Sequence, residues 1–137
     1  MQITRRAFIA AMGIALVGVS GCSSGKQEKN VPDGMSEAAF DLGTEVYDLA
    51  GEFLEDKTGP ETAGAKVQTA IDNRAKKIDA NNNKGDQRVL NLSAMIQMEF
   101  SMQGDDASGS VIKQYRDGLG YVLETGEYPD DLKSMDI

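Results

Sequence analysis

The stretch from Ser36 to Lys57, SEAAFDLGTEVYDLAGEFLEDK, predicts a long amphipathic helix. At about 100° per residue, its apolar side chains share one half of the helical wheel. Ser36 or Asp33 can cap the first turn, and the Gly59-Pro60 pair ends the helix. The apolar stripe consists of Phe40, Leu42, Val46, Tyr47, Leu49, Ala50, Phe53 and Leu54. Such a stripe needs other secondary structure to cover it.

The opposite side of this helix carries carboxylates at i+3 and i+4 spacing, within an arc of about 100°. One interpretation is a docking surface for a cationic partner protein. The other is a solvated helix face that keeps an exported protein soluble. The second is the more common reason for a charged face, although carboxylates without an interleaved Lys exceed ordinary charge patterning. We call this set the acidic face: Glu37, Asp41, Glu45, Asp48, Glu52, Glu55 and Asp56.

Three further amphipathic segments follow, over residues 61–80, 86–103 and 107–125, with short polar or Gly-containing connections. Asp86 is the expected cap of the third helix, and Gly126 ends the fourth. The segment 86–103 is apolar around most of its circumference, so we expect it to be the most buried helix. From Met35 onward, the sequence shows no strand-like alternation and no internal repeat. The predicted fold is therefore an all-α, four-helix up-down bundle, with two stacked helical hairpins as the runner-up.

The residues before Met35 do not show the amphipathic helical pattern of the rest of the chain. Arg5 and Arg6 precede an apolar run from Ala7 to Val19, which is too short for a hydrocarbon core that needs about 20 residues. A cleaved signal peptide explains it better than an uncleaved membrane anchor. The expected organisation is a signal peptide over residues 1–21, an acylated Cys with a flexible linker over 22–34, a four-helix domain over 35–126 and an acidic tail over 127–137.

Two short motifs indicate where the protein goes. Val19-Ser20-Gly21-Cys22 resembles the lipobox of exported bacterial lipoproteins, and the resemblance implies that Cys22 carries the lipid. Thr4-Arg5-Arg6-Ala7-Phe8-Ile9 resembles the twin-arginine signal, which implies export in the folded state. Ile9 and Ala10 depart from that family's usual Leu and Lys, which leaves the general secretory route open. The expected location is the extracytoplasmic face of the cell membrane, with the lipid as the anchor.

Composition excludes several functions. The 137 residues include one Cys and no His, so a Ser-His-Asp triad, a Cys-His pair and a His-ligated zinc site are impossible. The chain has 14 basic and 22 acidic side chains, a net charge of −8, which argues against binding nucleic acid. Losing Arg5 and Arg6 with the signal peptide makes the mature chain more acidic still. No cofactor or metal centre is indicated by any motif.

Glu99 and Arg74 are out of place on the apolar sides of their predicted helices. A carboxylate in such a position has to be paired, hydrogen-bonded or protonated. We therefore predict a buried or half-buried Glu99–Arg74 ion pair, with Arg88 as the second possible partner. The alternative is that Glu99 is a general acid. The segment Ala94–Ser101 is similar to the helix that carries the catalytic Glu of lytic transglycosylases, but Phe100 separates Glu99 from the Ser, and the family's downstream Gly-Leu-Met-Gln segment is absent.

Met95, Met98 and Met102 recur on one side of the predicted third helix. Thioethers are soft donors that suit Cu(I), but Met is also a common filler of helical cores. We expect core packing here.

Three functions remain open from the sequence. The leading hypothesis is a lipid-anchored binding or accessory module that contacts another exported protein. The alternatives are a lipoprotein that binds a small ligand or metal ion, and a cell-wall hydrolase that uses Glu99. The sequence favours a non-enzymatic module, and its oligomeric state does not follow from these residues.

Overall fold

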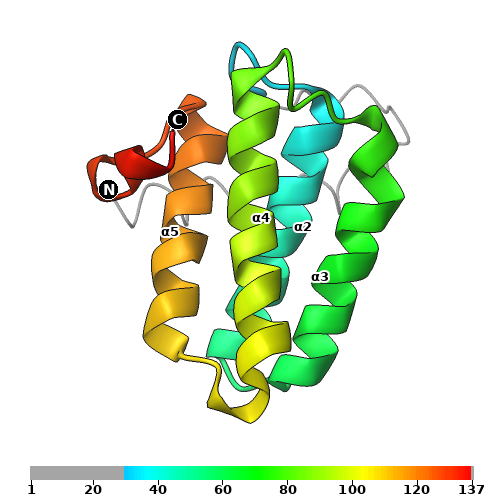
Figure 1. Cartoon of the computed structure of the whole chain (residues 1–137), viewed down its shortest axis with the longest axis vertical. Coiled ribbons are helices and arrows are strands. Elements are labelled where there is room, and N and C mark those ends of the chain that lie inside the picture. The colour runs from blue at the N-terminus through cyan, green and yellow to red at the C-terminus, as the bar shows by residue number, and fades with distance from the viewer. Residues whose placement is uncertain (1–29, 137) are drawn as a thin grey trace, which may run out of the picture. The chain divides into compact units, whose positions relative to one another are not determined.

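The computed structural model describes residues 30–136. Four α-helices form an up-down bundle: α2 (Glu37–Leu54), α3 (Pro60–Arg74), α4 (Lys84–Gln103) and α5 (Gly109–Thr125). Successive helices run in opposite directions and pack side by side, and α5 also packs against α2 (Figure 1). Three short 3₁₀ helices, η1 (Ala75–Lys77), η2 (Gly104–Asp106) and η3 (Asp130–Met135), follow α3, α4 and α5. The all-α bundle predicted from the sequence is confirmed.

The expected lipid-attachment and signal residues lie outside the described part of the chain. They are Cys22 together with Thr4, Arg5, Arg6, Phe8, Val19, Ser20 and Gly21. Among residues 30–136, no helix is both long enough and apolar enough to cross a membrane.

Polar side chains cap the helices close to the predicted positions. The Ser36 hydroxyl accepts a hydrogen bond from the Ala39 amide (3.1 Å), as expected for the start of α2. The predicted cap of α4 is wrong. Asn83 accepts from the Asp86 amide at 3.1 Å, and Asp86 itself is fully buried in the first turn. Gly126 ends α5 with φ 82°, the left-handed conformation that glycine adopts without strain.

The second helix is shorter than predicted. It ends at Arg74, and the chain continues through η1 into an extended residue at Ile78. Ile78 is therefore not on the helix, and only Ala63, Val67 and Ala70 of the predicted apolar stripe are fully buried. Because its buried side chains are small, α3 can lie close to α4. A β-carbon placed on the neighbouring Gly64 would lie 2.9 Å from the Phe100 Cβ of α4.

The core lies between all four helices, and α2 contributes most to it. Nine of the 18 residues of α2 are buried, against seven of the 20 in α4, so the expectation that the third predicted helix is the most buried is wrong. Phe53 of α2 meets Phe100 of α4 edge-to-face, with ring centroids 4.9 Å apart. The largest fully buried side chains are Phe40, Phe100, Leu42, Leu92, Ile96, Ile112, Leu119 and Leu123.

The residues after Gly126, expected from the sequence as an acidic tail, pack onto the bundle. We call residues 127–136 the C-terminal strap. Tyr128 and Leu132 of the strap are 3% and 5% exposed, and Leu132 lies over Gly118 of α5, where a β-carbon would collide with it. The strap therefore belongs to the same compact unit as the four helices.

Candidate functional site

The acidic face is shorter than the wheel suggested, because α2 ends at Leu54. Glu55 is the C-cap residue and pairs with Lys57 at 3.0 Å. Asp56 follows in the turn with φ 61°, so its side chain no longer continues the helical face. Five of the predicted carboxylates remain on the helix: Glu37, Asp41, Glu45, Asp48 and Glu52.

The predicted Glu99–Arg74 pair is not formed. Arg74 Nη1 instead donates to Glu45 Oε1 across the α2–α3 interface at 2.6 Å. The Glu99 carboxylate accepts from the Ser108 amide at 2.8 Å, where α5 begins. Arg74 thus pairs with α2, and Glu99 serves as an additional cap for α5.

Arg116 of α5 lies across the side of α2 next to the acidic face. Its Nε donates to the Tyr47 carbonyl at 2.9 Å, and its guanidinium lies over the Tyr47 ring, 3.9 Å from the centroid. This placement depends on Gly51, where a β-carbon would come within 2.7 Å of an Arg116 Nη atom. Nearby, desolvation raises the pKa of Asp48, and neighbouring carboxylates of α2 add to the rise, while Arg116 partly offsets it.

An open groove of about 410 Å³ runs between α2 and α3, beside the acidic face. Leu49 and Ala65 are apolar residues that line it, and the carboxylates of Glu45 and Glu61 line it too. Glu61 was not identified from the sequence, because it comes from the first turn of a different helix. The remaining lining residues are Thr62, Lys66 and Thr69. The groove thus combines apolar contact area with two carboxylates, of which Glu45 is paired with Arg74, and with the cation of Lys66.

A second open groove, of about 540 Å³, lies between α3 and α4. Phe100 and Gly64 form its apolar part, and uncharged polar side chains of Gln68, Gln97 and Ser101 line its walls. Glu61 is the one carboxylate that lines this groove, and Glu99 lines neither groove.

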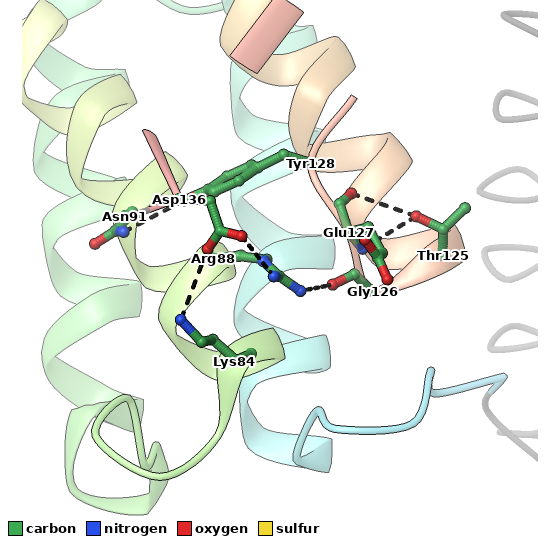
Figure 2. Close-up of polar contacts among 8 residues, drawn as sticks. All are labelled: Lys84, Arg88, Asn91, Thr125, Gly126, Glu127, Tyr128 and Asp136. Carbon is green, nitrogen blue, oxygen red and sulfur yellow. Dashed lines mark hydrogen bonds and ion pairs between the residues drawn. The ribbon is translucent and has the colours of Figure 1, made fainter. Parts of the chain in front are cut away.

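The C-terminal strap is held by Arg88 of α4 (Figure 2). Arg88 Nη1 donates to the Gly126 carbonyl at 2.7 Å, and Nη2 donates to the Asp136 carboxylate at 2.8 Å. The guanidinium also lies over the Tyr128 ring, 5.7 Å from the centroid, and Lys84 Nζ is 3.9 Å from Asp136. One cation thus joins Gly126, just before the strap, and Asp136, at the end of the strap, to α4. Arg88 was the second predicted partner of Glu99, but in the structure it binds Gly126 and Asp136.

The electrostatics of the strap follow from these contacts. The hydrogen bond from Arg88 lowers the pKa of Asp136, and the nearby cations reinforce the shift. Burial raises the pKa of Tyr128, whose hydroxyl also accepts a hydrogen bond from Asn91 at 3.3 Å. The strap is therefore both packed and charge-paired.

The three methionines of α4 do not fill the core. Met98 is 45% exposed and Met102 is 71% exposed, while Met95 is half-buried. The prediction of core packing is wrong for this row, because the buried side of α4 is formed by Val89, Leu92, Ile96 and Phe100, and the methionines project from the adjoining side.

The most informative contacts were hidden from sequence reasoning. Arg116 and Asp136 each looked like an ordinary surface charge, because their partners are 69 and 48 residues away in the chain. Within residues 30–136, no group of three or more His, Cys, Asp or Glu side chains is arranged to hold a metal ion.

Comparison with known proteins identifies no relative: no family model, no curated protein and no solved structure matches this chain.

Proposed function

We propose that this protein is a lipid-anchored docking module on the extracytoplasmic face of the cell membrane, which binds a cationic segment of another exported protein. The binding surface consists of the acidic face of α2 and the groove between α2 and α3. The anchor is the lipid implied by the lipobox at Cys22, and the linker over residues 22–34 connects it to the bundle.

The groove between α2 and α3 is the observation that carries this proposal. The apolar side chains of Leu49 and Ala65, which line it, can receive the aliphatic stem of a Lys or Arg, while the carboxylates of Glu45 and Glu61 can bind its charged end. An acidic face alone would attract any cation, but the groove adds shape and apolar contact. A partner segment with alternating basic and small apolar residues fits this surface best.

The pair between Arg74 and Glu45 holds one carboxylate of this surface in place, while Arg74 offsets part of its charge. Because Arg74 donates to Glu45 at 2.6 Å, the carboxylate is held at the edge of the groove. Both side chains of the pair remain partly exposed, at 31% and 44%, so a partner can approach them. An ordered carboxylate loses less side-chain entropy on binding than a free one.

The net charge of the domain is consistent with display away from the membrane surface. Residues 30–136 carry 21 acidic and 10 basic side chains. A polyanion is repelled by anionic lipid headgroups, so the acyl chains have to supply membrane attachment. The bundle is then held at the membrane but remains available to soluble or membrane-bound partners.

Site-specific photo-crosslinking in living cells tests this function. A photoreactive residue at Thr62, in the groove, should capture a discrete exported protein, and the same residue at Gln114, which is exposed on α5, should not. The double variant Glu52→Gln/Glu61→Gln should reduce the capture at Thr62 about tenfold or more, since removing rim charges slows electrostatically guided association.

The matched control removes the same charge elsewhere. Glu124→Gln/Glu127→Gln lies at the end of α5 and the start of the strap, and capture should stay within about twofold of the unmodified chain. If the Glu52→Gln/Glu61→Gln chain captures the same protein to the same extent, docking through the α2–α3 side is wrong.

A further inference from the structure

The outer side of α4 carries a row of thioethers, which we call the methionine stripe: Met95, Met98 and Met102. Met98 and Met102 are the exposed large apolar side chains among residues 30–136. Both belong to one row and are four residues apart, so their side chains are neighbours on the helix surface. Three of the five methionines between residues 30 and 136 lie in this stripe.

Packing does not explain the stripe. Core methionines fill irregular gaps between helices, as the buried Met35 does in this structure. The side of α4 that faces the core is already filled by Val89, Leu92, Ile96 and Phe100. Exposed apolar side chains gathered in one place mark a contact with something outside the bundle.

We infer that the methionine stripe binds a soft monovalent metal ion of the Cu(I) class. Met95 and Met98 are three residues apart and Met98 and Met102 four, so the β-carbons of each neighbouring pair lie about 5–6 Å apart, and Met has flexible torsions that allow neighbouring sulfur atoms to converge on one ion. Thioether sulfur selects Cu(I) over harder cations. The stripe is independent of the acidic face, which lies on a different helix.

The other possible metal-binding side chains of the chain do not compete with the methionine stripe. The chain has no His, and its one Cys is the residue that the lipobox resemblance assigns to acylation. The described residues also hold no carboxylate cluster suited to a hard cation. Thioethers are thus the soft donors available on the surface of this domain, and divalent hard ions should not compete for them.

Titration with Cu(I) under anaerobic conditions, against a chromophoric Cu(I) chelator, tests the site. The full chain is used with Cys22→Ser in every sample, so that a thiol cannot contribute. We expect stoichiometric binding of one ion, and at least a tenfold weaker affinity in Met98→Leu/Met102→Leu. Leucine keeps the apolar surface and the helix, but removes the sulfur.

A second readout locates the metal. With ¹³C-labelled methionine methyl groups and Ag(I) as a redox-inert probe, the resonances of Met95, Met98 and Met102 should shift, while those of Met35 and Met135 should not.

Met135→Leu is the matched control for the affinity measurement, and it should bind Cu(I) as the parent chain does.

Three results would overturn the inference. They are absence of Cu(I) binding by the parent chain, equal binding by Met98→Leu/Met102→Leu, and a shift of the Met35 or Met135 methyl groups comparable with that of the stripe. An apolar docking patch for a protein would give the first result, because such a patch needs no sulfur.

Discussion

Asp86 accepts three hydrogen bonds inside the bundle, although its position suggested a simple helix cap. The Ser36 amide donates at 2.6 Å, the Ser36 hydroxyl at 2.8 Å and the Asp79 amide at 2.9 Å. This one carboxylate therefore ties the first turn of α4 to the first turn of α2 and to the loop after α3. A fully buried carboxylate is tolerated because these donors replace its hydration.

Asp86→Ala should lower the free energy of unfolding by about 2–4 kcal/mol, because it leaves buried donors without an acceptor. Urea denaturation followed by circular dichroism measures this. Asp106→Ala, at an exposed position of η2, should change the free energy by no more than about 0.5 kcal/mol. Equal effects of the two substitutions would contradict the structural role assigned to Asp86.

The partner of each charged side chain was the least predictable property of this chain. The sequence showed that Arg74 and Glu99 each need a partner, and each has one, but Arg74 is bonded to Glu45 and Glu99 to the Ser108 amide. Helical wheels place a side chain on a side of its own helix only. They do not give the rotation of the neighbouring helix, which decides which charged group comes within reach.

At the scale of elements, α4 and the C-terminal strap differ most from expectation. Because α4 is apolar around most of its circumference, we expected it to be the most buried helix. One of its sides is covered by the strap at Arg88 and Asn91, and another carries the exposed methionine stripe. The strap is rich in acidic residues, but Tyr128 and Leu132 attach it to the bundle. Its sequence is too short to show helical or strand periodicity.

Attachment of the strap should depend on pH through Asp136. The pKa of this carboxyl is lowered in the folded state, so its pairing with Arg88 stabilises the strap above the ordinary Asp pKa of about 3.9. This contribution is lost as the pH falls through the lowered folded-state pKa. Lys84 and Lys133 are the other cations near the group.

Hydrogen–deuterium exchange of residues 127–136 measures the strap directly. At neutral pH, Asp136→Asn should raise exchange there about two- to fivefold, because a partly exposed ion pair contributes about 0.5–1 kcal/mol. Arg88→Met should raise it further, since the Gly126 carbonyl also loses its donor. Asp131→Asn, at an exposed position of the same strap, should leave exchange unchanged, and a rise equal to that of Asp136→Asn would refute the pairing role.

At the scale of the whole molecule, excess negative charge opposes compactness. The 21 acidic and 10 basic side chains of residues 30–136 repel one another across a small bundle. Ion pairs such as Arg74–Glu45 and Arg88–Asp136 offset part of this repulsion locally. Packing of the core therefore has to stabilise the fold against the net charge.

Added salt should stabilise the bundle. Raising sodium chloride from about 20 to about 200 mM shortens the screening length to below about 10 Å, and it should raise Tm by about 2–5 °C in a thermal melt. The variant Asp130→Asn/Asp131→Asn, with two fewer exposed charges, should show a smaller rise. A fall in Tm with salt would mean that the ion pairs outweigh the net repulsion.

The sequence by itself determined the helices and the fold class. The 3.6-residue spacing of apolar side chains from Phe40 to Leu54 predicts α2, and Gly104 and Gly126 mark the ends of α4 and α5. These signals are local, since each depends on neighbours within a few turns. The lipobox resemblance at Cys22 is local in the same sense, and it stays a prediction.

Tertiary structure alone decided the partners and the surfaces. The groove with Glu45 and Glu61, the stacking of Arg116 on Tyr47, and the strap over Gly118 each join segments that are distant in the chain. The exposure of Met98 and Met102 also depended on how α4 is rotated in the bundle. The rotation of each helix about its own axis is set by packing against the other helices, because all four share one core.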